Sequence, residues 1–161
     1  MIVVADTAPL NYLIQIECTE LLATLYGEVV VPAAVLRELE SPSSPSAVRL
    51  WAGNAPKWAK VIPDSIPSDP GLEFLGPGER EAIQISMDLG ADLLLIDERK
   101  GRNEAIRRGL RTTGTLGVIL TGAQAGLVDA EAAYRRLVGA SSFRTTPALE
   151  QHFLAQIGRR R

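Results

Sequence analysis

The chain opens with Met1-Ile-Val-Val-Ala-Asp6, a short apolar run that ends on an acidic residue. The same pattern returns at Leu93-Leu-Leu-Ile-Asp97, and Val29-Val-Val-Pro32 leads into a helix that carries Glu38. Short apolar runs of this kind are typical of strands buried in a parallel sheet. Helical patterns separate these runs, and the alternation predicts an α/β domain with a parallel sheet and helices on both of its faces.

The other segments extend this alternation. Strands are expected at residues 2–5, 29–31, 61–62, 93–96 and 110–113, with the run at 93–96 in the centre of the sheet and that at 61–62 on an edge. Helices are expected at residues 7–16, 19–26, 32–40, 47–55, 78–89, 100–108, 115–125, 130–138 and 147–157. Seven of the ten prolines lie between Pro42 and Pro77, so residues 41–77 are interpreted as a Pro-rich insertion, with a loop over 63–76.

Composition narrows the class of protein. A chain of 161 residues with 46% hydrophobic and 22% charged residues is typical of one soluble globular domain. It has no apolar run long enough to cross a bilayer, and its first residues lack the pattern of a signal peptide, so a cytoplasmic protein without membrane contact is expected. The single Cys18 and single His152 argue against disulfides, cysteine or histidine zinc sites and a Ser-His-Asp triad, and neither is expected to be catalytic.

Four acidic residues are predicted to meet at one edge of the sheet. Asp6 and Asp97 follow strands, Glu38 lies in the helix after a strand, and Glu79 begins the helix before the last buried strand. The ligand crevice of an open α/β sheet lies outside the carboxyl ends of its strands. Because clustered carboxylates repel one another, the cluster suggests a hard divalent cation, Mg²⁺ or Mn²⁺, and phosphate chemistry.

Each acid also has a structural interpretation. Asp6 suits the cap of the following helix, Glu38 suits a solvated helix face, and Glu79 suits the positive end of a helix dipole. Taken singly, each of these structural roles is the commoner one. The placement of all four at the same end of the sheet favours the site.

Basic residues gather next to Asp97. Six of them fall within thirteen residues: Arg99, Lys100, Arg102, Arg107, Arg108 and Arg111. Cations in the first turns of a helix oppose its dipole, so a phosphate backbone near Asp97 explains Arg99, Lys100 and Arg102 better than stability does. A solvated helix face remains the alternative. Three more arginines close the chain at residues 159–161.

Other motifs are weak. Gly76-Pro-Gly78 is not a phosphate loop, because no Gly-Lys-Ser/Thr follows it. Thr7 is a candidate for binding a phosphate or a water, and equally for capping a helix. Trp51 and Trp58 suit a small core or a dimer contact better than base stacking.

Several motifs in this order and spacing resemble a PIN domain, over roughly residues 1–140. They are Asp6-Thr7, Val31-Pro-x-x-Val-x-x-Glu38, Gly78-Glu79-x-x-Ala-Ile, Leu94-Leu-Ile-Asp97 with Arg102 and Ala105, and Gly114-Thr-Leu-Gly117. The last segment is similar to a prokaryotic branch of PIN-like proteins predicted to bind nucleic acids.

The resemblance implies a single-domain, three-layer α/β/α sandwich. Residues 1–140 would form the nuclease domain, and residues 141–161 would be a C-terminal helix and basic tail that pack on it. The implied activity is that of an Mg²⁺- or Mn²⁺-dependent ribonuclease, in many members the VapC-type toxin of a toxin–antitoxin pair. RNA, a small antitoxin protein and a second copy of the chain are the implied partners.

The family's acidic positions correspond to Asp6, Glu38, Glu79 and Asp97. Two departures are visible. The third acid is commonly Asp, whereas here it is Glu79, with Glu81 as a rival, and the Thr- or Ser-x-Asp often found at the fourth acid is replaced by Leu95-Ile96-Asp97. Neither removes a carboxylate.

Two other functions stay open. One is a PIN-like module that binds RNA or a protein without cutting, which the loss of an acid would have favoured. The other is a receiver-like domain that accepts a phosphoryl group. That fold needs a second acid beside Asp6 and a lysine near the last strand, and no lysine follows Lys100.

Overall fold

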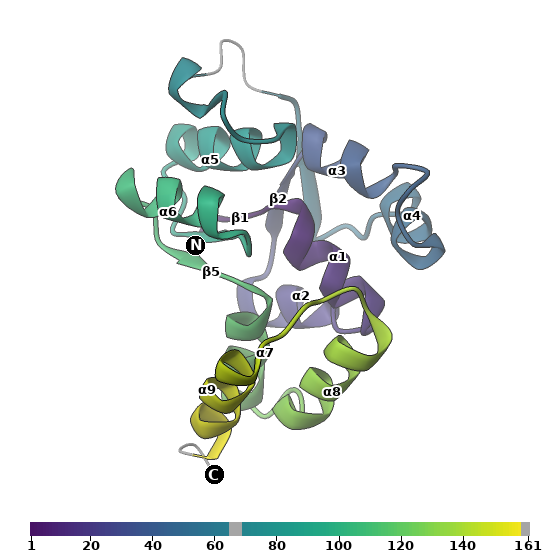
Figure 1. Ribbon diagram of the computed structural model, residues 1–161. Helices are drawn as coiled ribbons and strands as arrows, with labels where there is room; N and C mark the ends of the chain where they lie inside the picture. The colour runs from purple at the N-terminus through teal and green to yellow at the C-terminus, as the bar shows by residue number, and fades with distance from the viewer. Residues whose placement is uncertain (65–68, 159–161) are drawn as a thin grey trace.

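The computed structural model describes residues 1–64 and 69–158, and its centre is a five-stranded parallel sheet (Figure 1). The strand order is β3-β2-β1-β4-β5. The strands are β1 (Val3–Ala5), β2 (Val29–Pro32), β3 (Ala59–Ile62), β4 (Leu93–Leu95) and β5 (Thr112–Thr113). The prediction of a central strand at 93–96 was wrong: β1 is the middle strand, because the chain adds β2 and β3 on one side of it and returns to add β4 and β5 on the other.

The helices follow the predicted ones within about two residues. They are α1 (Thr7–Gln15), α2 (Glu20–Tyr26), α3 (Ala33–Leu39), α4 (Ser46–Gly53), α5 (Pro77–Leu89), α6 (Arg99–Arg107), α7 (Thr115–Gln124), α8 (Ala130–Ala140) and α9 (Pro147–Gly158). The loop expected over 63–76 contains a short 3₁₀ turn, η1 (Pro70–Leu72), and its residues 65–68 lie outside the described part.

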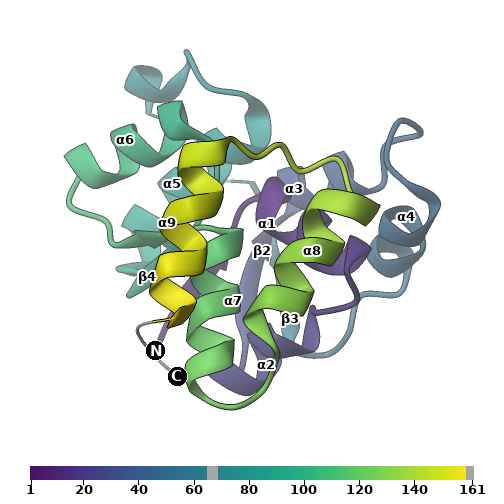
Figure 2. The same cartoon turned by 60° about the horizontal axis from the view of Figure 1, so that its bottom comes forward.

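Alternating side chains of the strands feed two hydrophobic clusters, one on each face of the sheet. In β1, Val3 and Ala5 belong to the cluster under α1, α2, α7 and α8, and Val4 belongs to the cluster under α5 and α6. This alternation is what the pleat of a strand imposes. Helices therefore cover both faces, and the predicted three-layer α/β/α fold is confirmed (Figures 1 and 2).

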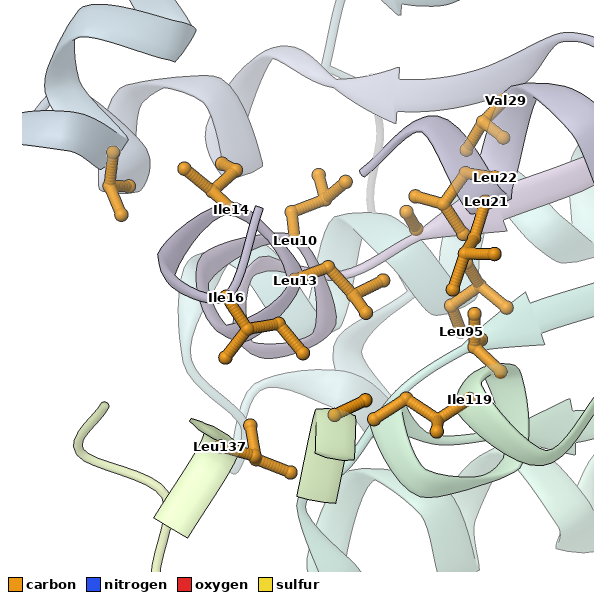
Figure 3. Close-up of a cluster of buried hydrophobic side chains, with 14 of the residues drawn as sticks. Leu10, Leu13, Ile14, Ile16, Leu21, Leu22, Val29, Leu95, Ile119 and Leu137 are labelled. Carbon is orange, nitrogen blue, oxygen red and sulfur yellow. The ribbon is translucent and has the colours of Figure 1, made fainter. Parts of the chain in front are cut away.

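The larger cluster is built around α1 (Figure 3). Its Leu10 and Leu13 are fully buried, and they lie beside Leu22 of α2 and Leu95 of β4. Spacings of three and four residues place such side chains on one helix face. This packing fixes the start of α1, and with it the residue that precedes the helix, Asp6.

Part of the Pro-rich segment belongs to this core. Strand β3 pairs with β2 along its whole length, and Val48 of α4 is fully buried. The rings of Trp51 and Trp58 lie 6.0 Å apart and pack against the larger cluster, as a small-core role predicts.

The C-terminal helix α9 lies alongside α7 (Figure 2). Its Phe153 is buried and stacks on Tyr134 of α8, with ring centroids 4.9 Å apart. The division of the chain at residue 140 stays a prediction, and the basic tail of residues 159–161 lies outside the described part.

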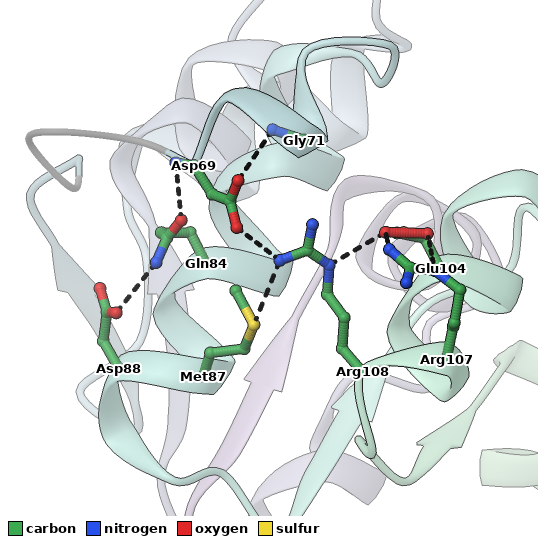
Figure 4. Close-up of polar contacts among 8 residues, drawn as sticks. All are labelled: Asp69, Gly71, Gln84, Met87, Asp88, Glu104, Arg107 and Arg108. Carbon is green, nitrogen blue, oxygen red and sulfur yellow. Dashed lines mark hydrogen bonds and ion pairs between the residues drawn. The ribbon is translucent and has the colours of Figure 1, made fainter.

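A polar cluster ties η1 to α5 and α6 (Figure 4). Arg108 donates to Asp69 at 2.7 Å and to Glu104 at 3.0 Å, and Arg107 also pairs with Glu104. The Arg108 side chain is largely buried, and these two carboxylates compensate its positive charge. The basic residues near Asp97 thus fall into two groups, since Arg107 and Arg108 form ion pairs with carboxylates of the chain.

Candidate acidic site

The site lies where the strand order reverses. Asp6 follows β1 and Asp97 follows β4, and these strands are neighbours, joined by the hydrogen bond from the Asp6 N–H to the Leu95 carbonyl oxygen (2.9 Å). The chain goes from β1 to β2 on one side and to β4 on the other, which makes this the topological switch point of the sheet. Ligand crevices of open α/β sheets occur at such points.

Glu38 reaches the same edge from α3 and is held from two sides. The Thr7 hydroxyl donates to its Oε2 at 2.5 Å, and the Gly78 N–H donates to its Oε1 at 2.8 Å. Glu38 therefore links the N-terminal ends of α1 and α5, and the interpretation as a solvated helix face does not describe it.

Asp97 is held by the start of α7. Its Oδ1 accepts from the Thr115 N–H at 2.7 Å, and its Oδ2 accepts from the Thr115 hydroxyl at 2.6 Å. These bonds favour the carboxylate, yet burial outweighs them and raises the pKa of Asp97. Arg102 opposes the rise through its positive charge.

Asp6 and Glu79 are two carboxyl groups of the cluster that are costly to ionise. Burial, with added repulsion from Glu38, Asp97 and Glu98, outweighs a hydrogen bond from the Thr7 backbone and raises the pKa of Asp6 from 3.8 to about 7. Burial and the charges of Asp6 and Glu98 raise the pKa of Glu79 from 4.5 to about 7. One oxygen of each, Asp6 Oδ1 and Glu79 Oε2, is buried with no hydrogen-bond partner in the described part of the chain.

Asp6 does not act as a helix cap. It precedes α1, but its side chain makes no capping hydrogen bond. An ionisable group that is 3% exposed and has an unpartnered oxygen is costly to keep. Its placement is therefore better explained by a ligand than by the helix.

Three glycines make room for three of the acids. A Cβ at Gly78 would lie 2.7 Å from Glu38 Oε2, and one at Gly114 would lie 2.5 Å from Asp97 Oδ1. A Cβ at Gly101 would press on Glu79 Oε2. Each carboxylate thus rests against a position where any larger residue would displace it.

The donors suit a hard divalent cation, because they are carboxylate oxygens that repel one another and two of them lack partners. Their arrangement is not yet a coordination shell: within residues 1–64 and 69–158, no three His, Cys, Asp or Glu side chains are grouped so as to hold an ion. Both oxygens of Glu38 and both oxygens of Asp97 accept hydrogen bonds from Thr7, Gly78 and Thr115.

The structure also shows what the sequence did not reveal. Glu98 adds a fifth negative charge, interacting with both Asp6 and Glu79. Thr115 positions Asp97, and its only sequence signal is the Gly114-Thr pair at a helix start. Of the two rival acids, Glu79 interacts with Asp6, Glu38 and Glu98, and Glu81 is buried in α5.

The four residues that are expected to contact nucleic acid have different surroundings in the structure. Arg99 and Arg102 line a hollow next to Asp97. The Lys100 ammonium lies over the ring of Phe74, 5.3 Å from its centroid. The Thr7 hydroxyl donates a hydrogen bond to Glu38. Contacts of all four residues with nucleic acid stay predictions.

No helix in the described ranges has the length and apolarity needed to span a membrane. A comparison with curated protein sequences found no match.

Residues 2–159 match a family model described as a PIN domain (DUF3368).

A similar solved structure is a PilT N-terminus domain protein from the hyperthermophilic archaeon Sulfolobus solfataricus P2. It is 17% identical, with a TM-score of 0.50, over 90% of this chain and 100% of that chain. At this identity the likeness supports the fold alone. The family model, in contrast, spans nearly the whole sequence, so the resemblance seen in the motifs is confirmed, and the chain belongs to the PIN-domain family, whose fold is of the nuclease type.

Proposed function

We propose that this protein is a divalent-metal-dependent endoribonuclease that hydrolyses RNA phosphodiester bonds at the acidic site. The observation that carries the proposal is the pair of buried, unpartnered oxygens, Asp6 Oδ1 and Glu79 Oε2, in a cluster of mutually repelling carboxylates. Such a cluster lowers the free energy of unfolding unless a ligand neutralises it.

Asp6, Glu38, Glu79 and Asp97 are the residues that would hold Mg²⁺ or Mn²⁺. When bound, such ions lower the pKa of a water and stabilise the charge that develops on phosphate oxygens. The protein's part is to keep the carboxylates directed at one place. Thr7 and Gly78 orient Glu38, and Thr115 orients Asp97. Asp6 and Glu79 must lose their protons on ion binding, so ion affinity rises with pH.

The proposal includes RNA as substrate, a second copy of the chain in a homodimer and a small antitoxin protein as partner, as in VapC-type relatives. These three parts rest on the family resemblance. The division into a domain of residues 1–140 and a C-terminal segment is proposed on the same ground.

A pool of mixed single-stranded RNAs tests the activity. The purified protein is incubated with it in Mg²⁺, in Mn²⁺ and in EDTA, beside Asp6→Asn and Asp97→Asn. We expect metal-dependent cutting that each substitution lowers at least about a hundredfold, because each removes an anionic ligand. Glu40→Gln is the matched control: Glu40 is exposed, lies two residues from Glu38 and should leave cutting unchanged.

The second candidate is a module that binds RNA or a protein without cutting it. One observation favours it: the acids of the described part are not grouped as a metal shell, and two of them are engaged by hydrogen bonds. RNA binding that survives both substitutions, with no cutting in either metal, would establish the binding module and end the nuclease proposal.

A further inference from the structure

A groove of about 670 Å³ begins at Asp97 and runs along α7 and the C-terminal segment. A second hollow, of about 340 Å³, joins it at three shared residues, Asp97, Phe143 and Arg144, and reaches Tyr12 of α1. Residues of α7 and α9 line this groove, and Figure 2 shows α9 in front of α7. Residues 141–158 therefore line a groove that shares Asp97, but none of the other three acids, with the acidic site.

Three guanidinium groups line the groove: those of Arg99, Arg102 and Arg144. Among the residues that the structure describes, none of the three forms an ion pair, in contrast to Arg107 and Arg108. The first two lie in the first turn of α6, where the helix dipole disfavours positive charge. Unpaired arginines in an unfavourable place are well suited to take phosphate oxygens, which they bind in a bidentate manner.

The same groove has an apolar side. Phe143 is half-buried, and its ring packs edge to face with Tyr12, with centroids 5.3 Å apart and an interplanar angle of 84°. Leu116 and Leu149 lie on the same lining. Rings of this kind bind the faces of bases, and only an unstacked base, as in a single strand, can reach them.

From this combination we infer that the groove binds the single strand next to the scissile phosphate. Arg99, Arg102 and Arg144 would contact successive backbone phosphates, and Phe143 would pack against one base. The inference deepens the proposed function. It rests on that function only for the position of the scissile phosphate, because binding in the groove does not require cutting. It gives the C-terminal segment a role in substrate binding.

Binding in EDTA tests the groove without any cutting. The anisotropy of a labelled single-stranded RNA of about ten nucleotides is followed from about 50 to about 200 mM salt. The full chain is compared with the double variant Arg99→Gln and Arg102→Gln, and with Arg144→Gln. The control is Arg49→Gln, which removes the same charge from α4, where Arg49 is exposed and contacts the Ser46 hydroxyl.

We expect the double variant to bind about tenfold more weakly, with Arg144→Gln also weakened and Arg49→Gln unchanged. The slope of log affinity against log salt should fall in magnitude by roughly 0.7 for each phosphate that the variant no longer neutralises. A merely structural effect would leave that slope unchanged. Single-stranded DNA of the same sequence shows whether the 2′-hydroxyl contributes; an equal loss with DNA assigns the contacts to phosphates and supports the groove.

Unchanged binding in the groove variants would overturn the inference, and so would an equal loss in Arg49→Gln, or in the binding of a duplex. The two proposals fail separately. Weaker binding by the groove variants without cutting by the unaltered protein keeps the groove and removes the nuclease. If the unaltered protein cuts RNA and the groove variants bind it normally, the nuclease proposal is kept and the groove is removed.

Discussion

At the scale of single residues, the acidic site lowers the free energy of unfolding of the metal-free protein. Asp6 is almost fully buried, has one unpartnered oxygen and interacts with four other carboxyl groups. A residue selected for folding alone would be apolar or hydrogen-bonded here. Strongly raised pKa values of buried carboxyl groups are typical of functional sites.

Asp6→Asn should therefore stabilise the metal-free protein at pH 8. The neutral amide removes a carboxylate that is mostly ionised above its pKa of about 7, and we expect a gain of about 1–3 kcal/mol in the free energy of unfolding. Urea unfolding in EDTA measures it. Glu40→Gln, which removes a charge from an exposed position, should change the free energy by less than about 0.5 kcal/mol. A less stable Asp6→Asn protein would mean that the charge of Asp6 serves the fold.

The sequence was informative about the acids and less so about what surrounds them. Asp6 and Asp97 were predictable because a carboxylate directly after an apolar run must lie at the carboxyl end of a strand. Glu98 was not, because its contribution depends on its distance from Glu79, which is 19 residues away in sequence. Thr115 escaped for the same reason: a threonine at a helix start is ordinary until a distant carboxylate is found beside it.

At the scale of elements, distant acids serve as caps for helices that lack their own. Helices α3, α5 and α7 begin without a side-chain cap from the residue that precedes them. Their first turns donate instead to three carboxylates from elsewhere: Asp64, Glu38 and Asp97. An acid at the start of a helix is stabilised by the dipole and by free N–H groups. Two of these three acids belong to the site, so the positions of the helices and of the carboxylates depend on each other.

These pairings explain where prediction from sequence stopped. The bounds of α5 and α7 were predicted within one residue, because the patterns that mark a helix act locally. The caps join residues 18 to 40 positions apart, which no local pattern reveals. The place of β4 beside the centre of the sheet was missed because an apolar run shows that a strand is buried and leaves its order in the sheet open.

Gly101→Ala tests whether α6 is shaped for the site. Its new Cβ would meet Glu79 Oε2 and, at 2.9 Å, Ile96 Cδ1, which are both ends of flexible side chains. Alanine also favours a helix by about 1 kcal/mol over glycine. We therefore expect near-neutral stability, within about 1 kcal/mol, and RNA cutting lowered about tenfold as Glu79 is displaced.

Gly139→Ala is the control for that substitution. Gly139 lies in α8 with open space around its Cβ position, so alanine should stabilise the protein slightly and leave cutting unchanged. Thermal unfolding and the cleavage rate are measured on both variants. Full activity in Gly101→Ala would show that the direction of Glu79 is unimportant.

At the scale of the whole molecule, the topology gathers acids that local sequence keeps apart. Strands β1 and β4 place Asp6 and Asp97 side by side, α3 brings Glu38, and α5 runs back along the sheet so that Glu79 lies at the same edge. Two hydrophobic clusters, one on each face of the sheet, pack behind this edge. The stability of the entire domain is thereby coupled to the protonation of the site.

The sign of that coupling follows from the raised pKa values. In the folded protein, Asp6 and Glu79 have pKa values of about 7, against 3.8 and 4.5 as ordinary values, so between about pH 4 and pH 7 the folded state binds more protons. Stability from these groups is complete below pH 4 and is lost as pH rises through 7. In EDTA, the unfolding temperature should therefore fall from pH 5 to pH 8.

A divalent ion should reverse the trend, because it binds the ionised carboxylates. At a concentration of about one hundred times its Kd, Mg²⁺ adds about 2.7 kcal/mol to the free energy of unfolding, and its Kd is lower at pH 8 than at pH 5. Thermal unfolding over this pH range, with Mg²⁺ and with EDTA, measures both effects. The double variant Asp6→Asn and Glu79→Gln should flatten the curve in EDTA and lose the gain from Mg²⁺. If Mg²⁺ stabilises the protein equally at pH 5 and pH 8, or stabilises the double variant as much as the unaltered chain, the ion binds elsewhere and the acids are not its ligands.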